Sequence, residues 1–239
     1  MNIQKETRMR SMGIYIAEFI GTFTLILVGA GSIIVTQAMG GGVAGLIAIA
    51  LAHGIAIGIM ASALGAISGG HFNPAVTFAM LLGKHILPMQ AVNYIIAQLA
   101  GAVAGALALC YLFFPGVWQA AQLGTPMLAQ NVSGLQGMFV EAILTFFLLL
   151  TIYGTAVDHR APKMGGLFIG LAITMDIFLG GPVTGAAMNP ARTFGPAFVG
   201  WLAGASYNPW AGHLVYWFGP LLGAAAAHVT YTKFLSERS

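Results

Sequence analysis

Three long stretches of this sequence carry almost no charge, and they decide what the chain can fold into. Each contains only one or two charged residues. The stretches are 11–83 with Glu18, 85–157 with Glu141, and 164–232 with Asp176 and Arg192. Charged residues make up 6% of the chain, whereas about a quarter of a soluble domain is charged. So few charges cannot cover a water-facing surface, and most of the chain must therefore face hydrocarbon.

Six apolar segments within these stretches are long enough to cross a bilayer. Crossing about 30 Å of hydrocarbon at 1.5 Å per residue takes roughly 20 helical residues. The segments run over about 12–35, 43–67, 89–112, 135–157, 164–180 and 211–232. The pattern predicts an all-α membrane protein with six transmembrane helices. The first segment is too long for the apolar part of a signal peptide, and no small-residue cleavage site is obvious, so we expect it to be a span.

The basic residues predict the orientation of these spans. The opposite-side segments, about 36–42, 113–134 and 200–210, contain no Lys or Arg. All basic residues except Arg192 lie before the first span, after the last, or in the alternate connections: Lys5, Arg8, Arg10, Lys84, Arg160, Lys163, Lys233 and Arg238. Cytoplasmic loops are enriched in Lys and Arg. We therefore expect both termini in the cytoplasm, and the protein in the cell membrane.

Two further apolar segments, Asn73–Leu82 and Asn189–Val199, are too short to cross, and both begin with Asn-Pro-Ala. The chain divides into halves of about 12–112 and 135–232, each with three spans and one short segment. Because three is odd, the second half must lie upside down relative to the first. The whole chain, 1–239, is then a single channel domain made of an inverted repeat, with the short segments as re-entrant half-helices that border a solute path.

The Asn-Pro-Ala tripeptides fit the start of a helix. Proline suits the first helical turn, and asparagine before it is a good N-cap. Two such helices entering from opposite faces would bring their positive dipole ends together, which hinders cations and protons and lets neutral molecules pass. The alternative is that both asparagines only cap helices. The predicted pore residues are Asn73, Pro74, Ala75, Asn189, Pro190 and Ala191.

These features resemble the aquaporin family (major intrinsic proteins) over essentially the whole chain. The motifs that carry the resemblance are AEFIGT at 17–22, SGGHFNPAVT at 68–77, TGAAMNPARTFGPA at 184–197 and VYWFGP at 215–220. The resemblance implies six helices with two half-helices, a pore in every subunit and a homotetramer. It also implies that Asn73 and Asn189 donate hydrogen bonds to water in mid-pore.

The resemblance places the family's selectivity filter at His53, Ile177, Ala186 and Arg192. This quartet is similar to that of plant tonoplast intrinsic proteins, whose members pass water and often ammonia or other small neutral solutes. Thr193 follows Arg192, where glycerol-conducting members usually have Asp. We therefore predict a passive water channel that also conducts ammonia or other small neutral solutes and excludes protons and ions. The alternatives are water alone, or urea and glycerol.

Several of these residues have a structural alternative. His53 could be an ordinary hydrogen-bonding residue between helices, and Arg192 could form an ion pair with Asp176. His71 resembles a position whose carbonyl lines the cytoplasmic vestibule, and its side chain could instead brace the loop. On a helix, Asp176 lies 100° from Ile177 and should point away from the pore, towards a neighbouring subunit.

Glu18 and Glu141 occupy matching places in the two halves. We expect each to accept hydrogen bonds from backbone N–H groups of a re-entrant loop, which has no partner in lipid. The alternative role is that of a proton carrier.

Other functional classes fit less well. A coupled transporter would also show inverted repeats, but it normally needs ion-binding carboxylates and a moving bundle. An adhesive membrane protein with a vestigial pore is disfavoured by the intact Asn-Pro-Ala pair with Arg192 and by the lack of long extramembrane segments. We expect no enzyme, because the sequence has no nucleophile–base pair and no phosphate-binding loop. We also expect no cofactor and no metal site, since Cys110 is the only cysteine and no cluster has metal-ligand spacing. Nine scattered basic residues make no nucleic-acid stripe.

Overall fold

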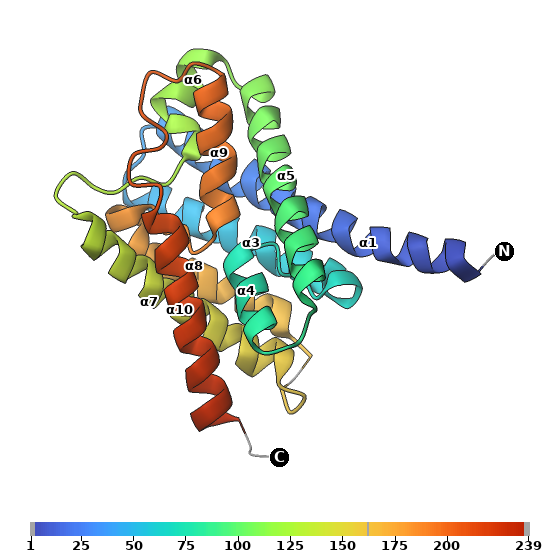
Figure 1. Ribbon diagram of the computed structural model, residues 1–239. Helices are drawn as coiled ribbons and strands as arrows, with labels where there is room; N and C mark the ends of the chain where they lie inside the picture. The colour runs from blue at the N-terminus through green and yellow to red at the C-terminus, as the bar shows by residue number, and fades with distance from the viewer. Residues whose placement is uncertain (1–2, 162, 237–239) are drawn as a thin grey trace.

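The computed structural model describes the backbone of residues 3–161 and 163–236 and the side chains of 12–161 and 163–236. The predicted basic cluster at 5–10 and the last residues, 237–239, therefore fall outside the described side chains. The described part of the chain is a bundle of helices and contains no β-strand (Figure 1).

The helical segments follow one another with short connections. In chain order they are α1 (Ile3–Thr24), η1 (Leu25–Ala30), α2 (Gly31–Ala38), α3 (Val43–Ser68), α4 (Pro74–Leu82), α5 (Pro88–Leu112), α6 (Pro115–Ala120), η2 (Gln122–Gly124), α7 (Gly134–Ile152), η3 (Tyr153–Val157), α8 (Gly165–Thr184), α9 (Pro190–Leu202), α10 (Val215–Thr230) and η4 (Tyr231–Leu235). The segments η1, η3 and η4 are π-helical and continue the α-helices before them, whereas η2 is a short 3₁₀ turn.

Five segments are long and apolar enough to cross a membrane, at positions close to the predicted ones. They are Met12–Ala38, Val43–Ser68, Pro88–Leu112, Gly134–Val157 and Gly165–Thr184. The sixth predicted span starts later than expected, because Asn208 folds the chain into turns by accepting hydrogen bonds from the N–H groups of Trp210 and Ala211. The α-helix that follows, α10, has 16 residues, and η4 prolongs it to Leu235.

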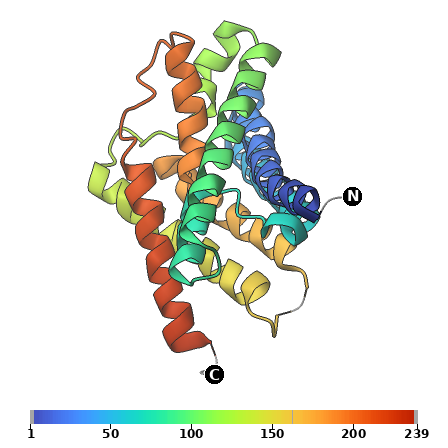
Figure 2. The same cartoon turned by 45° about the vertical axis from the view of Figure 1, so that its right-hand side comes forward.

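The two Asn-Pro-Ala segments form the half-helices α4 and α9, which have 9 and 13 residues and are too short to cross a bilayer. Both pack against α5 and α10. In Figure 1 α9 lies above α4, and in the turned view of Figure 2 both lie beside α5.

The long helices pack in pairs, α3 with α8, α7 with α10 and α1 with α5. Helix α3 touches α8 at Gly54, where an added Cβ would collide with the Thr174 hydroxyl and the Gly170 carbonyl. Small residues allow such close helix approach in membranes. This contact fixes the separation of the two helices that carry His53 and Ile177.

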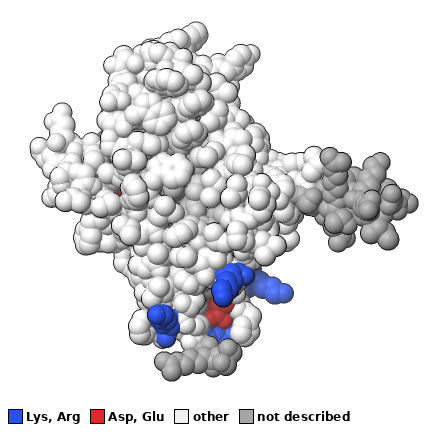
Figure 3. Space-filling view, in the orientation of Figure 1, with Lys and Arg blue, Asp and Glu red and all other residues white. Residues whose placement is uncertain are grey.

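The described basic side chains, Arg192 apart, gather at one end of the molecule (Figure 3). We call this the basic end; its residues are Lys84, Arg160, Lys163 and Lys233. Apart from the grey residues, the rest of the visible face is almost entirely uncharged.

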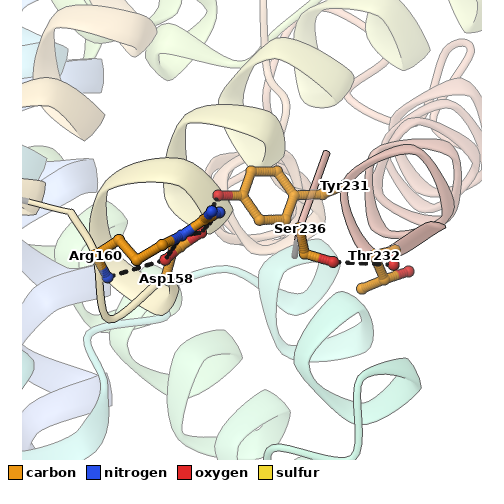
Figure 4. A network of polar contacts seen from close by, with 5 residues as sticks. All are labelled: Asp158, Arg160, Tyr231, Thr232 and Ser236. Carbon is orange, nitrogen blue, oxygen red and sulfur yellow. Dashed lines mark hydrogen bonds and ion pairs between the residues drawn. The ribbon is translucent and has the colours of Figure 1, made fainter. Parts of the chain in front are cut away.

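A polar network at the basic end ties the α7–α8 connection to the end of the chain (Figure 4). The Asp158 carboxylate pairs with Arg160 and accepts a hydrogen bond of 2.7 Å from the Tyr231 hydroxyl. These hydrogen bonds, those from Arg160 above all, hold the pKa of Asp158 well below its usual range. The Tyr231 ring stacks on Tyr153 at 5.5 Å between ring centres. Two segments far apart in the sequence are thus held together.

Candidate functional site

The loops before α4 and α9 meet in the middle of the bundle and exchange hydrogen bonds. The Asn73 side-chain N–H donates to the Met188 carbonyl at 2.8 Å, and the Asn189 side-chain N–H donates to the Phe72 carbonyl at 2.9 Å. Each half of the chain therefore satisfies a loop carbonyl of the other half. The predicted pair of asparagines lies side by side, with both side chains buried.

Both asparagines also cap their half-helices, as the sequence predicts. The Asn73 side-chain oxygen accepts from the Ala75 N–H at 2.8 Å, and that of Asn189 accepts from the Ala191 N–H at 3.0 Å and the Arg192 N–H at 3.2 Å. The prolines Pro74 and Pro190 are the first helical residues. Ala75 and Ala191 are fully buried.

The residue before each asparagine has a strained backbone. Phe72 has φ 50° and Met188 φ 52°, and Ala186 in the second loop has φ 45°. Residues other than glycine seldom adopt such values, which persist only where the surroundings hold them in place. Each loop therefore needs firm anchors.

Glu18 is the anchor of the first loop. Its fully buried carboxylate accepts hydrogen bonds from the N–H groups of His71 at 3.0 Å and Phe72 at 2.7 Å. It also accepts from the Ser68 hydroxyl at 2.6 Å and the Gln98 amide at 2.7 Å.

Glu141 anchors the second loop in the same way. It is fully buried and accepts from the N–H groups of Ala187 at 2.9 Å and Met188 at 2.7 Å, and from the Thr184 hydroxyl at 2.6 Å. Both glutamates thus accept hydrogen bonds from backbone N–H groups of the loops before the half-helices.

A second matched pair escaped the sequence analysis. The Tyr94 hydroxyl donates to the Ser68 carbonyl and the Tyr216 hydroxyl to the Thr184 carbonyl, both at 2.7 Å. Each tyrosine thus binds the last residue of the helix before its loop. The signal was present, because Tyr216 stands within the VYWFGP motif.

A cavity runs along the meeting point of the loops and has two parts. The inner cavity, on the side of the basic end, is lined by Asn73, Asn189, His71 and Ala186 among others. The outer cavity is lined by residues of the α2 end and of the α6–α7 connection. His53, Ile177 and Arg192 line both parts, so they lie where the two meet. The four predicted filter positions therefore surround one cavity.

Arg192 is almost fully buried, with 1% of its surface exposed. Its Nη1 donates to the Gly124 carbonyl at 2.8 Å, whereas Nε and Nη2 have no hydrogen-bond partner among the described residues. Within the same part of the chain the ion pair found is that of Asp158 with Arg160, and Arg192 has none with Asp176. The guanidinium therefore keeps free donors beside the cavity.

Both histidines near the cavity bond within their own segment. Nδ1 of His53 lies 2.9 Å from the Ile49 carbonyl of the same helix, so His53 makes no hydrogen bond to another helix among the described residues. Nδ1 of His71 lies 3.1 Å from the Thr77 hydroxyl, and its ring meets Tyr94 edge-on. His71 thus braces its loop and lines the inner cavity as well.

The expected direction of Asp176 is wrong in one respect. The residue lines neither part of the cavity, but it is 2% exposed and so is enclosed within this chain rather than open to a neighbour. Gly180, one helical turn further on the same face, contacts Leu144 of α7. Helix α7 therefore covers this face, and Asp176 Oδ2 has no partner among the described side chains.

Comparison with known proteins agrees with this geometry. The sequence matches the family described as Major intrinsic protein over residues 5–231. It is 42% identical over 224 residues to "Aquaporin TIP4-4" of Zea mays, covering 90% of this chain and 84% of the maize protein. It is 40% identical over 239 residues to "Aquaporin AqpM" of Methanothermobacter marburgensis, covering 93% and 97%. The fold is similar to the aquaglyceroporin from Plasmodium falciparum, with a TM-score of 0.85, 25% identity, and 94% and 97% of the two chains covered.

Proposed function

The chain belongs to the major intrinsic protein family, whose members are passive channels for water and small solutes rather than enzymes, and we propose that it conducts water and ammonia while excluding protons and ions. The observation that supports this most is the junction of the inner and outer cavities at His53, Ile177 and Arg192.

The asparagine pair supports exclusion of protons. A carboxamide NH₂ has two N–H donors, and the loop carbonyls use one donor of Asn73 and one of Asn189. The second N–H of each is left for the oxygen of a passing water. A water that accepts from both asparagines cannot also accept a proton from the next water, so a chain of proton transfers breaks there.

The field at the centre supports exclusion of cations. The N-termini of α4 and α9 carry positive partial charge, and Arg192 adds a full one. Neutral molecules are not repelled by this field. Its effect is largest where the cavity is narrow and water is scarce.

The lining of the junction supports passage of ammonia beside water. The side chains of Ile177 at the junction and of Ala186 beside it in the inner cavity offer no hydrogen bonds, so a solute gives up part of its hydration there without replacement. This loss costs ammonia less than water, because ammonia is the more weakly hydrated of the two. Arg192 and His53 supply the polar contacts. Water alone, or a wider range with urea or glycerol, are the alternatives that the flux measurements below decide.

The proposal extends to the domain organisation, the assembly and the orientation of the protein. Residues 1–239 form one channel domain whose halves, about 12–112 and 135–232, are inverted repeats, and four copies assemble in the bilayer. The integral multi-pass character is common to the family. We place the basic end and both termini in the cytoplasm, by the enrichment of Lys and Arg on that side.

The test is stopped-flow light scattering on vesicles that contain the purified protein. Shrinkage in an impermeant osmolyte reports water, and internal alkalinisation under an ammonium gradient reports ammonia. Wild type should exceed empty vesicles in both. The double variant His53→Phe/Ile177→His should keep the water flux and lose the ammonia flux, because it restores a polar wall.

Two results would count against the proposal. If wild type matches empty vesicles in both assays, water conduction is refuted for this protein. If ammonia flux persists in the double variant, the junction does not decide between the two solutes. Urea and glycerol gradients applied to the same vesicles measure the wider alternative.

A further inference from the structure

Gly29 lies against the ring of His53. Gly29 is part of η1, the π-helical segment that joins α1 to α2. A Cβ added there would lie 2.6 Å from Cδ2 and 2.7 Å from Nε2 of His53. Carbon atoms do not approach so closely, because the optimal separation is about 3.5–4.0 Å. Only glycine leaves the imidazole room in its present place.

The opposite edge of the same ring is fixed by the backbone of α3. Nδ1 of His53 lies 2.9 Å from the Ile49 carbonyl. A carbonyl oxygen can only accept, so Nδ1 carries a hydrogen. In the neutral ring Nε2 is then an acceptor. No described residue makes a hydrogen bond to Nε2, which is left to accept from a molecule in the cavity.

The π-helical form of η1 belongs to this arrangement. Single turns of π-helix inside α-helices are frequent at functional sites. The Ser32 hydroxyl donates to the Gly29 carbonyl at 2.6 Å, so this carbonyl of the π-helical turn has a hydrogen-bond partner nearby in the sequence. Leu25 of the same segment lines the inner cavity. The segment is thus part of the cavity wall and also the surface on which the His53 ring rests.

We propose that Gly29 is a positioning residue of the filter. Because Gly29 lacks a side chain, His53 can lie back against η1, and this sets the width of the junction and the direction of the acceptor Nε2. This inference rests on the proposed function and deepens it. With the ring in place, the junction offers free N–H groups of Arg192, the acceptor Nε2 of His53 and the apolar wall of Ile177, and Ala186 follows in the inner cavity. Water and ammonia both accept and donate, so each can meet both polar groups at once.

The experiment is a double-mutant cycle with Gly29→Ala, His53→Ala and their combination. In Gly29→Ala the ring must swing towards the cavity, so water permeability per channel should fall severalfold, and the ratio of ammonia to water permeability should change. In the His53→Ala background the same glycine substitution should change neither the water permeability nor the ratio, because the imidazole ring that the new methyl group would displace is absent.

Gly31→Ala is the matched control. Gly31 is the first residue of α2, two residues after Gly29, and its added Cβ would approach only the end of the Leu109 side chain, at 3.1 Å. This variant should retain the wild-type solute ratio. Thermal unfolding of the four proteins of the cycle gives a readout that does not depend on flux: Gly29→Ala should lower the midpoint in the wild-type background alone.

Three outcomes would overturn the inference. Gly29→Ala could leave flux, ratio and midpoint unchanged; it could damage the His53→Ala background equally; or Gly31→Ala could shift the ratio by as much. A failure of the proposed function looks different, because wild type itself would then match empty vesicles while the thermal cycle still reports the contact.

Discussion

Two buried acidic side chains on neighbouring helices show how differently one kind of residue can be used. Glu141 of α7 accepts three hydrogen bonds, two of them from backbone N–H groups. Asp176 of α8 is as well buried, yet its Oδ2 has no partner among the described residues. Removing a buried acceptor leaves its donors without a hydrogen-bond partner, whereas removing an unpaired polar group leaves no other group unpaired.

Substituting Glu141 should therefore destabilise the fold, whereas substituting Asp176 should not. In Glu141→Gln an NH₂ group replaces one carboxylate oxygen, so at least one of the donors to Glu141 loses its acceptor. The free energy of unfolding should fall by about 1–3 kcal/mol. Asp176→Leu should leave it unchanged or raise it, since an unpaired buried polar group is replaced by an apolar one of similar size. Unfolding of both variants in detergent micelles measures the difference. Equal damage would mean that Asp176 has a stabilising partner after all.

The sequence predicted these residues unevenly, and the reason is physical. The caps at Asn73 and Asn189 and the acceptor role of Glu18 depend on local helix-end chemistry and on repeat symmetry, both visible in the sequence. The burial of Asp176 depends on which helix covers that face of α8. The contact of Gly29 with His53 depends on a π-helical turn, which no local residue pattern predicts.

At the scale of elements, the connection from α7 to α8 is held by the end of the chain. Asp158 closes a turn with Arg160 and accepts from the Tyr231 hydroxyl (Figure 4). Tyr153 carries the contact further, since its hydroxyl donates to the Ala79 carbonyl of α4 at 3.0 Å. A half-helix that borders the cavity is thereby connected to a loop at the basic end.

Loosening this network should expose the loop to protease. Tyr231→Phe removes the hydroxyl and keeps the ring stack, so tryptic cleavage after Arg160 or Lys163 should become severalfold faster than in wild type. Ser236→Ala is the control, because it removes only the bond from Ser236 to the Thr232 carbonyl. Unchanged cleavage in Tyr231→Phe would show that the hydroxyl contributes nothing to docking.

The pH dependence of this loop follows from Asp158. A carboxyl whose pKa is lowered in the folded state stabilises the fold above its ordinary pKa, and the contribution is lost only as pH falls through the lowered value. Protonation of Asp158 should therefore not speed tryptic cleavage of the wild-type loop at any pH at which trypsin is active.

The elements themselves were predictable where hydrophobic length decides them. Five spans lie within a few residues of the expected limits. The sixth begins late because the turn at Asn208 competes with the helix. Local side-chain hydrogen bonds of this kind compete with helix formation, and the hydropathy of the residues does not reveal them.

At the scale of the molecule, the lysines whose side chains the structure describes all lie at the basic end (Figure 3). A membrane-impermeant amine reagent should therefore modify Lys84, Lys163 and Lys233 in inside-out vesicles and spare them in right-side-out ones. Peptide mass spectrometry identifies the sites. Asn131→Lys, at an exposed position of the α6–α7 connection, supplies the converse control. Modification of Lys84 from outside would invert the proposed orientation.

The exchange of hydrogen bonds between the two loops also dictates an order of biosynthesis. Asn73 and Phe72 are translated well before Met188 and Asn189, which are their partners. Until the later loop arrives, the earlier one has a donor and a carbonyl that lipid cannot satisfy. A nascent chain that stops after α5 should hold this loop in water or in a chaperone rather than in the bilayer. Completion of the central path is then among the last events of assembly.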